Sequence, residues 1–142
     1  MPRIDFYILA AHSTEARTRF CCRLATKAWR DGHRVFIRTD SEATAEAIDA
    51  LLWSAKPTSF IPHGRQSDDG QTPIVIDTAP QPGDLLINLA QDMPEDWQQR
   101  LRIAEVITAD PQVKDAGRQR YRDYHQAGSK PHTHNIADQE HA

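Results

Sequence analysis

Short apolar segments alternate with longer amphipathic segments along this chain. Residues 4–10 (IDFYILA) form an apolar run rich in residues that favour β-structure, which predicts a buried strand. Similar runs at 34–38, 74–76, 85–89 and 103–107 predict four further strands. The segment that follows Ser13 has apolar residues at every fourth position, which is typical of one helical face: Ala16, Phe20, Leu24 and Ala28.

Helix-start signals mark three more segments. Residues 40–42 (DSE) precede a helix predicted to run to about Trp53, and residues 93–96 open a short one. Asp110 followed by Pro111 predicts the start of a final helix, with the aspartate as N-cap. Strands that alternate with helices predict an α/β fold with a mainly parallel sheet flanked by helices, in a Rossmann-like three-layer arrangement.

No glycine-rich motif accompanies this fold. Neither G-x-x-x-x-G-K-[ST] nor G-x-G-x-x-G occurs, and the segment after the first strand (AAHSTEA, 10–16) has no glycine, so no phosphate-binding loop is predicted. We expect one domain over residues 1–128 and a polar, flexible tail over 129–142. The polar stretch 57–72 is expected to be a surface loop.

Composition narrows the class of protein. The 142 residues are 39 % hydrophobic, too many for a wholly disordered chain, and no apolar run approaches the roughly 20 residues of a membrane span. The first ten residues lack the pattern of a signal peptide. The two cysteines, Cys21 and Cys22, are adjacent and offer neither a disulfide framework nor a CxxC pair. We therefore expect a cytoplasmic protein with reduced thiols.

Charge is distributed unevenly. Residues 1–40 carry a surplus of +4 and residues 41–109 a deficit of −7. The acidic middle segment argues against direct binding of nucleic acid. The stretch from Lys114 to Arg122 holds four basic residues and one acid, a small basic face suited to an acidic peptide or a phosphate.

Candidate metal ligands have simpler explanations. Asp40, Asp77 and Asp110 each follow a predicted strand, and together they would suit a metal-dependent phosphodiesterase. Helix capping, however, accounts for Asp40 and Asp110. His132 and His134 lack a third ligand nearby, so neither a metal nor a cofactor is predicted. The enzyme stays the alternative hypothesis.

Two segments favour protein binding. Around a proline-marked turn, an exposed apolar patch is one interpretation and core packing is the other; its residues are Trp53, Phe60, Ile61, Pro62 and His63. On the final helix, Lys114 and Arg118 share a face with residues of the next turn, Tyr121 and Arg122. This face is either simply solvated or a clamp for a carboxylate, with an aliphatic neighbour such as Ile107 or Val113 contacting an apolar side chain.

Four segments, in this order, resemble the chi subunit of the bacterial DNA polymerase III holoenzyme: FYIL (6–9), AWRDGHRVFI (28–37), LLWSAKPTSFIPHG (51–64) and GRQRYRDYHQAG (117–128). The resemblance implies a non-catalytic adaptor. Such subunits bind the acidic C-terminal tail of single-stranded-DNA-binding protein, and they bind the psi subunit, which links them to the clamp loader.

The resemblance also implies roles for individual residues. Lys114 and Arg118 fall where the family binds the tail, with Arg122 as a helper and Tyr121 and Ile107 beside them. The segment from Trp53 through Phe60, Ile61 and Pro62 to His63 falls in the region used for psi, or for a helicase that competes for the same patch.

Overall fold

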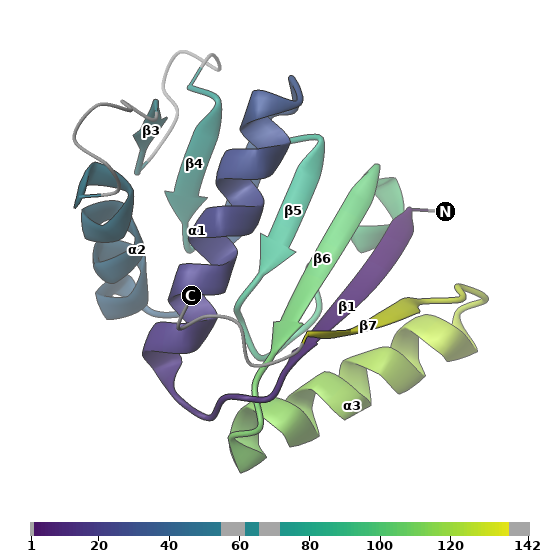
Figure 1. Ribbon diagram of the computed structural model, residues 1–142. Helices are drawn as coiled ribbons and strands as arrows, with labels where there is room; N and C mark the ends of the chain where they lie inside the picture. Colours follow the sequence, from purple (N-terminus) through teal and green to yellow (C-terminus); the bar gives the residue numbers. More distant parts are fainter. Residues whose placement is uncertain (1, 55–61, 66–71, 137–142) are drawn as a thin grey trace.

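The structure is a computed structural model that describes residues 2–54, 62–65 and 72–136. Strands and helices alternate along most of the chain (Figure 1). The elements are β1 (Arg3–Leu9), α1 (Thr14–Arg30), β2 (Val35–Arg38), α2 (Glu42–Ser54), β3 (His63–Gly64), β4 (Ile74–Asp77), β5 (Leu85–Asn88), the 3₁₀ helix η1 (Trp97–Gln99), β6 (Arg102–Ile107), α3 (Pro111–Gln126) and β7 (His132–Ile136).

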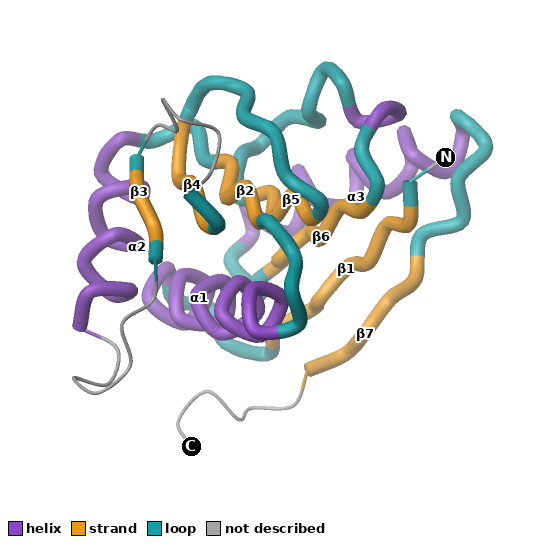
Figure 2. Tube along the Cα trace, turned by 90° about the horizontal axis from the view of Figure 1, so that it is seen from above, coloured by secondary structure: helices purple, strands orange, loops and turns teal. Residues whose placement is uncertain are grey.

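The seven strands form one sheet in the order β3-β4-β2-β5-β6-β1-β7, and every neighbouring pair is parallel. Figure 2 shows α1 and α2 on one face of the sheet and α3 on the other. The predicted α/β fold with a mainly parallel sheet is therefore confirmed. Because all strands run the same way, their carboxyl ends share one edge of the sheet with the amino-terminal ends of the helices (Figure 1).

Successive apolar side chains of the strands point to alternate faces of the sheet and form an apolar core on each face. In β2, Val35 and Ile37 belong to the apolar cluster beneath α1 and α2, whereas Phe36 belongs to the cluster beneath α3. In β6, Ala104 and Val106 face the first cluster, and Ile103 and Ile107 face the second. Successive side chains of a strand point to opposite faces, so continuous apolar runs serve a sheet that is covered on both sides.

The tail differs from its prediction. The prediction of a flexible tail over residues 129–142 does not hold for His132–Ile136, which form β7 and pair in parallel with β1. Residues 137–142 lie outside the described residues. The open edge of β1 offers unpaired backbone groups, and two contacts of His134 fix the register. Its ring stacks on that of Tyr7 with centroids 5.0 Å apart, and its Nε2 lies 2.8 Å from Oδ1 of the buried Asp5. The polar composition of His132–Ile136 therefore gave no indication that this segment forms an edge strand.

The short helix that residues 93–96 are predicted to open is present as the 3₁₀ helix η1, which begins directly after them at Trp97 with Asp96 as its N-cap. Trp97 is buried against the ring of Tyr124, with centroids 5.1 Å apart, which anchors this segment beneath the α3 face. None of the helices in the described part of the chain is long and apolar enough to cross a membrane.

Candidate functional site

Helix α3 presents the basic residues that the sequence singled out. It begins as predicted, with Asp110 Oδ2 accepting a hydrogen bond of 3.2 Å from the Val113 amide and Pro111 in the first turn. Gly117, Arg120 and Tyr124 are buried and mark the face that packs on the sheet. The register of the helix then sets the positions of all the other side chains.

Lys114, Arg118 and Arg122 lie at four-residue intervals on the opposite, exposed face of α3. Arg118 is 61 % exposed, and the nearest carboxylate that it pairs with, Asp115 Oδ1, is 4.0 Å from its Nη1. Such a long, exposed ion pair contributes little and is readily exchanged for another acceptor. One Arg122 nitrogen donates to Gln119 Oε1 at 3.0 Å. The structure therefore brings three cations together in successive turns.

The two apolar candidates beside these cations differ in accessibility. Tyr121 is half-buried and packs edge-on against Phe6, with ring centroids 5.2 Å apart, so one side of its ring is supported by the core. Ile107 is only 3 % exposed and lies directly beneath Gly117. A ligand on the outer face would meet Tyr121 first, and Ile107 acts mainly as part of the wall behind it.

Arg120, the fourth base of this stretch, points the other way. It is 2 % exposed, and its Nε donates to Glu105 Oε1 at 3.0 Å. Asn88 and Tyr124 complete a buried network by donating to the same carboxylate. Burial, with the charge of Glu105 and the hydrogen bond to it, raises the pKa of Tyr124.

Sequence reasoning placed Arg120 within the basic face and did not foresee this network. The signal was present in the helical spacing. Arg120 follows Gly117 by three residues and Val113 by seven, so it belongs to the inward stripe. Only three of the four bases are therefore available to a partner on the outer face.

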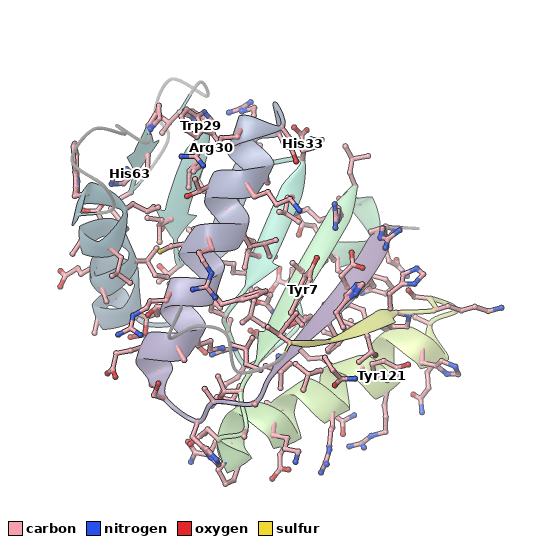
Figure 3. The ribbon with its side chains drawn as sticks, viewed as in Figure 1. Tyr7, Trp29, Arg30, His33, His63 and Tyr121 are labelled. Atoms are coloured by element: carbon pink, nitrogen blue, oxygen red, sulfur yellow. The ribbon has the colours of Figure 1, made fainter. Side chains whose placement is uncertain are left out.

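A second surface lies at the carboxyl-terminal end of α2. Trp53 is 60 % exposed, and its ring meets the ring of His63 edge-on with centroids 4.8 Å apart. The Nε2 atom of His63 lies 3.1 Å from Asp49 Oδ1, and Pro62 is half-buried. The other two residues predicted for this patch, Phe60 and Ile61, lie outside the described residues. Figure 3 shows His63 and Tyr121 at opposite ends of the molecule, so the two surfaces are separate.

The three strand-end aspartates each accept a hydrogen bond from a backbone amide. Asp77 Oδ1 accepts from the Thr78 amide at 2.7 Å, and Asp110 caps α3. Asp40 does not cap α2: Ser41 does so through Thr44, while Asp40 Oδ2 accepts from the Gln91 amide at 3.1 Å. Over the described residues, no group of three or more His, Cys, Asp and Glu side chains is arranged to hold a metal ion.

Comparison with known proteins gives one consistent result. Residues 1–132 match the model of the family described as DNA polymerase III chi subunit, HolC. A DNA polymerase III subunit chi from Pseudomonas aeruginosa is 34 % identical over 139 residues, which cover 96 % of this chain and 98 % of that protein. The subunit chi of Haemophilus influenzae is 34 % identical, covering 93 % and 96 %, and that of Escherichia coli K12 is 28 % identical, covering 90 % and 94 %.

Proposed function

Because the chain belongs to the DNA polymerase III chi subunit family, we propose that it binds the acidic C-terminal tail of single-stranded-DNA-binding protein through the outer face of α3. The observation that carries this proposal is that two exposed cations, Lys114 and Arg118, lie one helical turn apart on the same face of α3. Arg118 provides a planar fork for the terminal carboxylate, and Lys114 provides a mobile charge for a neighbouring acid.

We expect one tail to bind weakly and several tails on the same partner to bind more tightly. Each charge-assisted hydrogen bond contributes about 1.5–3 kcal/mol net, and less at exposed positions because water and salt screen it. An apolar side chain of the tail adds contact with Tyr121, which the core holds in place. Several tails on an oligomeric partner raise the effective concentration for the second contact, so affinity for the assembled partner exceeds that for one peptide.

The second surface, at Trp53, Pro62 and His63, supports a link to the psi subunit and through it to the clamp loader. An exposed tryptophan held by a neighbouring ring is typical of an interface anchor. Phe60 and Ile61 complete this proposed patch, and a helicase is the alternative occupant. In this role the protein has no catalytic site of its own, needs no cofactor, and acts in the cytoplasm beside the replicating chromosome.

A titration tests the tail contact. An acidic peptide with a free C-terminus is added to the full chain, and Arg118→Ala is expected to weaken binding about tenfold or more. Amidation of the peptide should weaken binding to the unaltered chain by a similar factor. The matched control is Arg19→Ala, which removes an exposed arginine from α1 on the other face of the sheet. The proposal would be refuted if the free-acid peptide bound the unaltered chain, Arg118→Ala and Arg19→Ala with equal affinity, and if amidation of the peptide left its affinity for the unaltered chain unchanged.

A further inference from the structure

A cavity of about 420 Å³ opens at the carboxyl edge of the sheet. Its lining comes from the amino-terminal parts of α1 and α3 and from the residues that follow β5 and β6. Figure 1 shows these helix and strand ends at the same edge of the sheet. Its lining includes Arg17, Thr108 and Arg120 but none of the exposed residues Lys114, Arg118 and Arg122. It is therefore distinct from the proposed tail-binding face, on the other side of the same helix.

Arg120 lines this cavity and has one donor without an acceptor. Its Nε donates to Glu105, and its Nη1 donates to the Gln91 carbonyl. Its Nη2 atom is fully buried and has no hydrogen-bond partner among the residues that the structure describes. A buried guanidinium N–H without an acceptor destabilises a fold by about 1–3 kcal/mol, or more for a charged group, so a ligand that supplies an acceptor recovers that free energy.

Arg17 adds a second cation from α1. Its Nε donates to the Val106 carbonyl at 2.8 Å, and its Nη1 donates to the Leu89 carbonyl at 3.2 Å. Among the described residues it makes no ion pair. Burial, and after it the positive charge of Arg120, lowers the pKa of Arg17. Glu105 contacts only one of these two guanidinium groups, so the cavity wall holds a cation without a direct counter-ion.

The amino-terminal ends of two long helices also point toward this cavity. Helices α1 and α3 have 17 and 16 residues, and each brings a partial positive charge and first-turn amides to its amino-terminal end. Two carboxylates limit which anion fits, because Asp40 and Asp110 line the same cavity. They repel an anion that has no proton to donate. Inorganic phosphate keeps a hydroxyl near neutral pH that can donate to a carboxylate, and a phosphomonoester keeps one in its monoanion, which predominates below its second pKa of about 6, whereas sulfate has none.

We propose that this cavity binds the phosphate group of a small phosphomonoester, with Arg17 and Arg120 donating hydrogen bonds to its oxygens. The volume exceeds what a phosphate alone needs and lies within the range of about 300–1,000 Å³ that is typical of small-molecule pockets. Side chains replace the glycine-rich loop that the sequence lacks, and helix termini supply the remaining positive potential.

The test is a titration of the full chain followed by NMR of the arginine Nε–H resonances. The probes are inorganic phosphate, a deoxynucleoside monophosphate as the ester, and sulfate, at matched ionic strength and about pH 6, where about half of the ester still carries its proton. We expect saturable shifts of the Arg17 and Arg120 resonances with the first two probes, and affinity for sulfate lower by about tenfold or more. Arg17→Gln should weaken phosphate binding about tenfold, whereas the control variants Arg19→Gln and Arg118→Ala should leave it unchanged.

A second variant keeps the proposal falsifiable if Arg17→Gln fails to fold. Asp40→Asn retains an acceptor for the Gln91 amide but removes the negative charge, so sulfate should gain affinity relative to phosphate. Shifts that never saturate, or that are equal for phosphate and sulfate in the unaltered chain, would overturn the proposal. Binding of phosphate without binding of the ester would overturn the assignment to a phosphomonoester. Because Arg118→Ala serves here as a control, failure of tail binding and failure of this site are distinguishable.

Discussion

A methyl group placed on the α-carbon of Gly117 would lie 2.6 Å from Cδ1 of Ile107, so α3 approaches β6 as closely as it does because residue 117 has no side chain. This contact holds the register of the helix that presents Lys114 and Arg118 outward and Arg120 inward. A single close approach between a helix and a strand thus underlies both the exposed basic face and the buried arginine.

Gly117→Ala is therefore expected to lower the free energy of unfolding by about 1 kcal/mol, because overpacking outweighs the better helix propensity of alanine. The same change made in an Ile107→Val background, where Cδ1 is absent, should instead stabilise by about 0.5–1 kcal/mol. Urea unfolding of the four proteins measures the difference. An equal effect in both backgrounds would show that the two residues do not limit this approach.

The buried Asp5 predicts how stability changes with pH. Burial alone would raise the pKa of Asp5, but hydrogen bonds from Arg3 and His134 and the positive charges of Arg102 and Arg3 outweigh it and hold that pKa below its ordinary value. The carboxylate therefore stabilises the fold above the ordinary aspartate pKa of about 4, and this contribution is lost as pH falls through the lower, folded-state value. Below both values it contributes nothing.

Asp5→Asn should accordingly flatten the loss of unfolding free energy between about pH 5 and pH 2, measured by denaturant titration at each pH. Asp31→Asn, at an exposed position after α1, is the matched control and should leave the slope as it is. If the Asp5→Asn profile runs parallel to that of the unaltered chain, the ion pairs of Asp5 do not set its acid sensitivity.

The adjacent cysteines should be inert in the folded protein. Both are free and buried on α1, and burial raises the pKa of Cys22 to about 12 and that of Cys21 well above its ordinary value. Only the thiolate reacts, so labelling by a disulfide reagent at pH 8 should be about 100-fold or more slower than in denaturant. Rapid labelling of the native chain, with Cys22→Ser as the comparison, would contradict this assignment.

Trp53 and Trp29 offer a matched pair for the second surface. Trp53 is 60 % exposed, so Trp53→Ala should cost less than about 1 kcal/mol of stability while weakening capture of the proposed psi partner about tenfold. Trp29 packs against the apolar core, so Trp29→Ala should lower stability by about 2 kcal/mol or more. Thermal melts and a pull-down of each variant separate the effects. A large loss of stability in Trp53→Ala would show that Trp53 packs in the core and is not an interface anchor.

Most of the helices and strands, and the fold class, follow from the sequence alone. Apolar runs such as that of β6 specify strands buried on both faces, and Asp110 with Pro111 specifies the start of α3, because these signals act within a few residues of the chain. Periodicity also placed Lys114 and Arg118 on a common face, and the order of four motifs indicated the family.

Packing in three dimensions sets which side of α3 meets the sheet, and therefore that Arg120 turns inward to Glu105 while Arg118 stays in solvent. It also decided that the polar segment His132–Ile136 becomes an edge strand, because the acceptors that hold it lie on β1, more than a hundred residues earlier. Contacts between distant segments depend on how elements pack, and hydrophobic pattern along one segment carries no record of its partner.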